Sequence, residues 1–125
     1  MKTNLLVWFE IPVLNIERAK EFYDNVFDIS IAIHDLGGLK MGWFPNVPEK
    51  PGATGSLMQH ESYIPSTSKG PLLYFSSKDV AIELARITNV GGEILKEKTL
   101  IGEGHGYMAL FKDSEGNRIA LHSPT

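Results

Sequence analysis

Two residues with reactive side chains stand at matching places in a sequence that repeats itself. Glu10 interrupts the apolar segment 5–13, and Tyr74 lies 64 residues later, in the apolar segment 72–77. A carboxylate can hold a metal ion or orient a base, and a phenol can stabilise a developing oxyanion. Residues related by an internal repeat can meet in one cavity, so these two are the first candidates for a functional site.

The repeat continues into the helix that follows each apolar segment. Asn15 and Asp79 are both good N-cap residues, and both precede apolar residues at helical spacing. In the first segment Glu10 lies on the face opposite to Phe9 and Ile11, because strand side chains alternate. A charge inside an apolar strand needs a partner if it is buried; the alternative is an edge-strand carboxylate that faces water.

Three strands are predicted after each helix. They cover residues 29–34, 39–44 and 54–60 in the first half, and residues 93–97, 106–112 and 118–123 in the second. The order strand, helix, three strands, written twice, predicts an α+β fold of paired βαβββ modules. We expect one domain, 1–125, with module 1 at about 1–60, a linker at about 61–70 and module 2 at about 71–125.

Composition narrows the class of function. The 125 residues carry a net charge of −3 with 12 scattered Lys and Arg, so neither nucleic acid nor an anionic membrane is an expected partner. The absence of cysteine excludes thiol nucleophiles and thiolate metal ligands. The apolar run near the N-terminus is too short for a signal peptide or a membrane span. We expect a soluble, cytoplasmic protein with small-molecule or protein partners.

Three sequence motifs carry a resemblance to a known family. VLNIERAKEFY at residues 13–23, Gly91-Gly92 after the second helix, and FKDSEGNRIALHS at residues 111–123 together resemble the vicinal oxygen chelate superfamily. That superfamily holds glyoxalase I, bleomycin and fosfomycin resistance proteins and extradiol dioxygenases. The resemblance implies two βαβββ modules whose sheets curl around a shared cavity that holds a small molecule. It also implies a homodimer, sometimes with modules exchanged between chains.

The resemblance also implies where a divalent metal is usually held. Family enzymes carry His or Gln early in the first strand of each module and Glu on the last strand. In this sequence the matching positions hold no metal-binding side chain: they are Trp8, Leu57, Leu72 and Ala120. One same-face step of two residues further along each strand, the occupants are polar. These are Glu10, Gln59, Tyr74 and His122. A slip of one residue in the strand at 54–60 replaces Gln59 by Met58 and His60.

Three functions fit these residues. In the first, Glu10, His122 and Gln59 hold a divalent ion such as Zn, Ni, Mn or Fe for a vicinal-oxygen substrate. In the second, no metal is bound: Glu10 orients His122 as a general base beside a carbonyl, Tyr74 stabilises the oxyanion, and a lyase or isomerase step follows. The third is a binding protein of the bleomycin resistance type, which captures a small flat or apolar molecule without chemistry.

Aromatic residues are the expected walls of an apolar pocket, with simple sheet packing as the alternative. They are Trp8, Trp43, Tyr107 and Phe111. His105 lies in the glycine-rich segment GEGHGY and is expected near the mouth of the cavity, although a solvated loop histidine is the alternative. His34 and His60 are expected on the surface.

Overall fold

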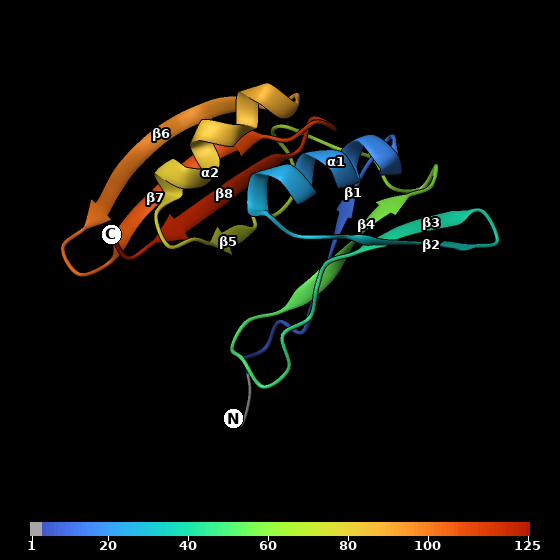
Figure 1. Cartoon of the computed structure of the whole chain (residues 1–125), viewed down its shortest axis with the longest axis horizontal. Helices are drawn as coiled ribbons and strands as arrows, with labels where there is room; N and C mark the ends of the chain where they lie inside the picture. The colour runs from blue at the N-terminus through green and yellow to red at the C-terminus, as the bar shows by residue number, and fades with distance from the viewer. Residues whose placement is uncertain (1–3) are drawn as a thin grey trace.

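Each half of the chain forms a four-stranded sheet with one helix packed against it (Figure 1). The computed structural model describes residues 4–125. The first half contains β1 (Trp8–Pro12), α1 (Ile16–Phe27), β2 (Ala32–Leu36), β3 (Leu39–Trp43) and β4 (Thr54–Gln59). The second contains β5 (Tyr74–Ser76), α2 (Val80–Ile87), the 3-10 turn η1 (Thr88–Val90), β6 (Glu93–Gly102), β7 (Gly106–Lys112) and β8 (Arg118–Ser123). The predicted fold of paired βαβββ modules is confirmed.

The internal repeat is preserved in the sheet register. The first sheet has the strand order β1-β4-β3-β2, and the second has the corresponding order β5-β8-β7-β6. β1 runs parallel to β4 with Glu10 opposite Ser56, and β5 runs parallel to β8 with Tyr74 opposite Ala120. Both members of the second pair lie 64 residues after those of the first. Glu10 and Tyr74 are therefore structurally equivalent.

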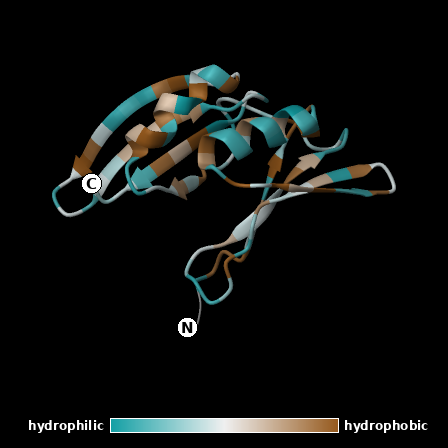
Figure 2. Cartoon of the chain, viewed as in Figure 1, coloured by the Kyte–Doolittle hydropathy of each residue, from teal (hydrophilic) through white to brown (hydrophobic). Residues whose placement is uncertain are grey.

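Most strand bounds differ from the sequence expectation by one to three residues; β2, for example, covers Ala32–Leu36 instead of 29–34. β1 and β5 begin only at Trp8 and Tyr74, because the pairing of β1 with β4 starts at Thr54 and leaves residues 5–7 without a ladder partner. Figure 2 shows this segment ahead of β1 as hydrophobic, and Leu5, Leu6 and Val7 are all exposed. β6 runs on to Gly102 because β7 keeps pairing with it across register shifts.

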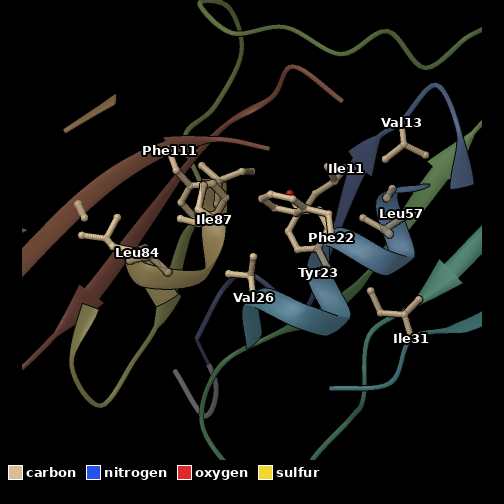
Figure 3. Close-up of a cluster of buried hydrophobic side chains, with 14 of the residues drawn as sticks. Ile11, Val13, Phe22, Tyr23, Val26, Ile31, Leu57, Leu84, Ile87 and Phe111 are labelled. Atoms are coloured by element: carbon tan, nitrogen blue, oxygen red, sulfur yellow. The ribbon is translucent and has the colours of Figure 1, made fainter. Parts of the chain in front are cut away.

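The core lies between the two helices and the sheet faces that they cover. The apolar stripe predicted for α1 runs from Ile16 to Phe27. Five of its members are fully buried, namely Ile16, Ala19, Phe22, Tyr23 and Val26, and Phe27 is partly buried against the core. Figure 3 shows Phe22 of α1 and Phe111 of β7 in the same cluster, and their ring centres lie 5.9 Å apart. Both modules therefore contribute the helix-bearing faces of their sheets to one core.

The opposite side of each sheet carries no helix and is called here the helix-free face. On β1 this face holds Trp8, Glu10 and Pro12, and on β5 it holds Tyr74 and Ser76, because the intervening Ile11 and Phe75 pack into the core. In the described part of the chain, neither helix has the length and apolar character that a membrane crossing requires.

A buried polar network fixes the two modules to each other. The Glu115 carboxylate, in the turn between β7 and β8, accepts hydrogen bonds from the backbone N–H groups of Leu14 and Asn15 at 2.8 and 2.9 Å. It also accepts two from the Arg18 guanidinium, at 2.7 and 2.9 Å. Burial by itself raises the pKa of Glu115, but the bond from Arg18 and the backbone donors outweigh it, so the pKa is lowered.

A second carboxylate lies deeper in the same turn. Tyr23 Oη donates to Asp113 Oδ2 at 2.6 Å, and Asn117 Nδ2 donates to Asp113 Oδ2 at 3.0 Å and to the carbonyl of Pro12 at 2.7 Å. Burial raises the pKa of Asp113, because the ionised carboxylate loses water. Burial and the charge of Asp113 together raise the pKa of Tyr23 well above its usual value. Residues of the two motifs at 13–23 and 111–123, which carry the family resemblance, thus join the two modules.

Candidate functional site

Glu10 lies exposed on the helix-free face of the first sheet with two hydrogen-bond donors beside it. Tyr63 Oη donates to Glu10 Oε1 at 2.8 Å, and Trp8 Nε1 donates to Glu10 Oε2 at 3.3 Å. The hydrogen bond to Glu10 raises the pKa of Tyr63. Tyr63 comes from the linker, 53 residues away along the chain. The carboxylate is thereby held in place, with part of its acceptor capacity unused.

Aromatic side chains share this face with Glu10. Trp8 and Trp43 are 40% and 42% exposed, although both are large and apolar. Trp43 lies opposite Ser56, which itself lies opposite Glu10, so the three residues form one row across β3, β4 and β1. The His34 ring lies 4.0 Å from that of Trp43. The result is a partly apolar surface with one carboxylate on the edge strand β1.

The helix-free face of the second sheet carries Tyr74 and His122. Tyr74 is 54% exposed, and His122 lies opposite Met108 on β7 and Ser76 on β5. His122 Nε2 is 2.8 Å from the backbone carbonyl of His105, which can only accept, so Nε2 is the donor. The side chain of His105 is exposed in the turn between β6 and β7. The turn therefore contributes to the site through its backbone.

Glu10 and His122 do not form a pair within one chain. Glu10 is hydrogen bonded to Tyr63 and Trp8, and His122 to the carbonyl of His105, so each has partners from different segments. Of the residues predicted for the site, Glu10, Tyr74, His122, Trp8 and Trp43 lie on helix-free faces. The structure thus brings the predicted polar groups to the same type of surface, but on two separate sheets.

Gln59 lies on the other face of its sheet, which corrects its predicted place beside Glu10. Its Oε1 accepts a hydrogen bond of 2.6 Å from the backbone N–H of Ile16, at the start of α1. The pairing of Glu10 with Ser56 fixes the register of β4. Because side chains alternate along a strand, Met58 shares the face of Ser56 and Gln59 points to the opposite face. The same register changes one of the four metal positions inferred from the family. Ser56, rather than Leu57, is the residue of the first module that is equivalent to Ala120 in the second.

Two aromatic residues predicted for the pocket walls also lie elsewhere. Phe111 is fully buried in the core against Phe22. Tyr107 lies opposite Ser123, the residue after His122, so its side chain points to the face opposite to that of His122. Lys98 Nζ lies 4.7 Å from the centre of the Tyr107 ring. Both belong to the helix-bearing face, and for Phe111 sheet packing was the correct alternative.

The donors on these faces do not fit a divalent metal. The four family positions hold Trp8, Ser56, Ala120 and Leu72, of which only Ser56 carries an oxygen in its side chain. That hydroxyl donates to the carbonyl of Leu57 at 2.8 Å. Among residues 4–125, no three His, Cys, Asp or Glu side chains gather closely enough to hold an ion. With Gln59 turned toward α1, the predicted set of Glu10, His122 and Gln59 is not assembled.

Sequence reasoning missed the part of the linker that reaches the site. Residues 61–70 appear only as a polar connection, because a contact such as that of Tyr63 with Glu10 leaves no periodic signal in the sequence. His34 was expected on the surface, yet its stacking on Trp43 makes it part of the aromatic face. Its position opposite Met41 follows from the hairpin, so correct strand pairing is the signal that reveals it.

Comparisons with solved structures agree with this fold. TnmS3, an antibiotic binding protein from a Streptomyces species, is 26% identical, covers 100% of this chain and 99% of its own, and has a TM-score of 0.65. The fosfomycin resistance protein FosX from Listeria monocytogenes is 20% identical, with coverage of 100% and 94% and a TM-score of 0.69. A glyoxalase I mutant from Zea mays is 15% identical, with a TM-score of 0.71. The match covers 95% of this chain and 46% of the maize chain.

The family itself is identified by a match between the sequence and a family model. A search of curated proteins finds no match. The family model described as Glyoxalase/Bleomycin resistance protein/Dioxygenase superfamily matches residues 5–121, which include both helices and every strand up to most of β8. The chain belongs to the glyoxalase/bleomycin resistance protein/dioxygenase superfamily.

Proposed function

We propose that this protein binds a small, flat, largely apolar molecule and does not transform it. The observation that carries the proposal is the aromatic surface on the helix-free face of the first sheet. Trp8 and Trp43 remain 40% and 42% exposed there, and the half-buried Met41 lies on the same face of β3 as Trp43. Large exposed aromatic side chains on one face are typical of surfaces that bury a ligand or a partner.

Two further observations support binding over catalysis. The positions at which family enzymes hold a metal carry Trp8, Leu72, Ser56 and Ala120, of which only Ser56 has an oxygen in its side chain, and that hydroxyl is buried and bonded to the carbonyl of Leu57. In addition, TnmS3, the 26% identical relative, is described as an antibiotic binding protein. A planar ligand stacked on Trp8 or Trp43 gains aromatic contacts, and Glu10 at the edge accepts one hydrogen bond that orients it.

We further propose that two copies of the chain enclose the ligand. Several large apolar residues at or near the helix-free faces and sheet edges are exposed in one copy: Leu36, Trp43, Tyr74, Leu100 and Ile101. A monomer rarely leaves so much apolar surface in water. Sedimentation equilibrium tests this step. A single species of twice the 13.9 kDa chain mass is expected at micromolar concentration, and a monomer at all concentrations contradicts it.

Ligand binding is tested by thermal shift and tryptophan fluorescence with 1-naphthol and 2-naphthol, two small, flat and largely apolar molecules, as probes. A ligand at a hundred times its dissociation constant stabilises the folded state by about 2.7 kcal/mol, which is readily detected. We expect at least one probe to raise the Tm and to quench tryptophan emission. Trp43→Ala should abolish the shift. Ile82→Ala removes an exposed apolar side chain from α2 and should not, so equal loss in both variants refutes the site.

A second candidate, proton transfer without a metal, is favoured by one observation. Because His122 Nε2 donates to the carbonyl of His105, Nδ1 is left as the acceptor nitrogen and can take a proton. Tyr74 stands on the adjacent strand and the same face. This candidate predicts isomerase or lyase activity on an α-carbonyl substrate that disappears in His122→Ala. Activity that survives the change removes His122 from that role.

A further inference from the structure

A pocket of about 210 Å³ lies beneath the linker, where β1, the linker and the start of β8 meet. Three charged side chains line it: Glu10 from β1, Lys69 from the linker and Arg118 from β8. Most of the remaining wall is apolar, with Ile64, Pro71, Leu73 and Ile119 as its main members. An apolar pocket with a few convergent charged groups is the usual form of a small-molecule site.

The linker residues that line this pocket are hydrogen bonded to both modules. The Ser66 N–H donates to Asn117 Oδ1 at 3.3 Å, and the Ser66 carbonyl accepts from the N–H of Arg118 at 3.4 Å. Thr67 Oγ1 donates to the carbonyl of Gly116 at 2.7 Å, and Tyr63 is bonded to Glu10. The pocket is therefore formed before a ligand arrives, so binding does not have to order the segment.

The charges in the pocket are of both signs and are not paired with each other. Within residues 4–125, neither Arg118 nor Lys69 lies within ion-pair distance of an acidic side chain. Glu10 receives neutral donors from Tyr63 and Trp8 but no cation. A carboxylate offers about four acceptor positions, so about two remain for a ligand. Cationic and anionic groups that share a pocket without neutralising each other match a ligand with both charges.

We propose that this pocket binds a zwitterionic α-amino acid with an apolar side chain. The guanidinium of Arg118, with Lys69 beside it, receives the ligand carboxylate, for which the planar Arg fork is well suited. Glu10 receives the ammonium group, and the ligand side chain packs against Ile64 and Leu73. The volume lies below the roughly 300–1,000 Å³ of pockets for drug-sized ligands, which suits a ligand the size of leucine.

Isothermal titration calorimetry with L-leucine tests the proposal. Two analogues serve as comparison: 4-methylpentanoate lacks the ammonium group, and 3-methylbutylamine lacks the carboxylate. We expect leucine to bind and each analogue to bind about tenfold more weakly or worse, because each leaves one charged group unpaired. No heat from leucine at millimolar concentration, or equal affinity for leucine and both analogues, overturns the proposal.

Single substitutions test which charged side chain of the pocket binds which charged group of the ligand. Arg118→Gln should weaken leucine binding about tenfold or more, whereas Lys50→Gln, an exposed lysine that does not line the pocket, should not change it. Lys69→Gln provides a second test if Arg118→Gln does not fold. Glu10→Gln should weaken leucine binding but not that of 4-methylpentanoate, which should gain affinity, because only leucine presents an ammonium group and the change removes an unpaired negative charge beside the anion. If both ligands weaken equally, Glu10 does not bind that group and the proposal is overturned.

Failure of this proposal is distinguishable from failure of the proposed function. 1-Naphthol and 2-naphthol probe the aromatic face through Trp43, which does not line this pocket. The same probes applied to Arg118→Gln should shift the Tm as in the unmodified protein. Leucine applied to Trp43→Ala should bind with unchanged affinity.

Discussion

Replacing Glu115 by alanine should destabilise the protein by about 3 kcal/mol, because Glu115 is the central acceptor of the network that joins the modules. Its carboxylate accepts five hydrogen bonds of 2.7 to 2.9 Å, from Leu14, Asn15, Ser114 and twice from Arg18. Breaking a buried ion pair by removing one partner costs about 3–5 kcal/mol. The Arg18 side chain is 51% exposed, so water replaces part of its contacts and the lower end of that range applies.

Urea unfolding followed by far-UV circular dichroism measures this loss. With a slope of about 1–3 kcal/mol per molar, the midpoint should fall by about 1–3 M. Arg18→Ala should cost less, about 1 kcal/mol, because its partner keeps the three other donors. Lys50→Ala serves as a surface control. A loss below about 0.5 kcal/mol for Glu115→Ala, or an equal loss for Arg18→Ala and Glu115→Ala, refutes the reasoning.

Three further predictions concern the same framework. Because the folded-state pKa of Glu115 lies below its usual value of 4.5, the ionised group stabilises the fold above that pH, and the stabilisation is lost as pH falls through the folded-state pKa. The difference in unfolding free energy between the unmodified protein and Glu115→Gln should therefore be largest at neutral pH and shrink in acid; a constant difference contradicts the assignment. Tyr23→Phe removes a donor from the buried Asp113 carboxylate and should cost about 1–3 kcal/mol in urea unfolding, with no loss as the contrary result. Gly92→Ala places a Cβ 2.6 Å from atoms of Ile87 and Phe22 and should lower the Tm. Gly102→Ala is the control, because its Cβ lies 3.7 Å from the nearest atom and should leave the Tm unchanged. Similar Tm values for the two variants argue against close packing at Gly92.

Much of the fold was predictable because its signals are local. The N-caps Asn15 and Asp79, each followed by an apolar stripe, predicted the two helices, and both caps accept the expected backbone hydrogen bonds. The alternation around Glu10 predicted which face it occupies. Residues 5–7 are as apolar as a strand, yet they lie outside the sheet because the partner strand begins at Thr54. Strand length depends on the partner and is not encoded in the segment alone.

The candidate site was only partly predictable, and Gln59 shows why. Its type and position suit a cavity as well as those of His122 do, but a shift of one residue in register reverses the face. That register depends on pairing with β1, from a segment more than forty residues earlier, and on the backbone N–H of Ile16, which the Gln59 side chain satisfies. Tyr107 and Phe111 were misplaced for the same reason: aromatic character does not indicate which face of a strand packs into the core.

The sequence by itself determined the duplicated order of elements, the helices and their caps, and the placement of Glu10 and Tyr74 at equivalent points. Those features depend on residues a few positions apart, or on a constant offset between two copies. Only the tertiary structure decided the register of β4, the separate hydrogen-bond partners of Glu10 and His122, and the pocket in which Glu10, Lys69 and Arg118 meet beneath the linker. These depend on contacts between segments far apart in the chain, whose geometry is set when both sheets and helices pack around one core.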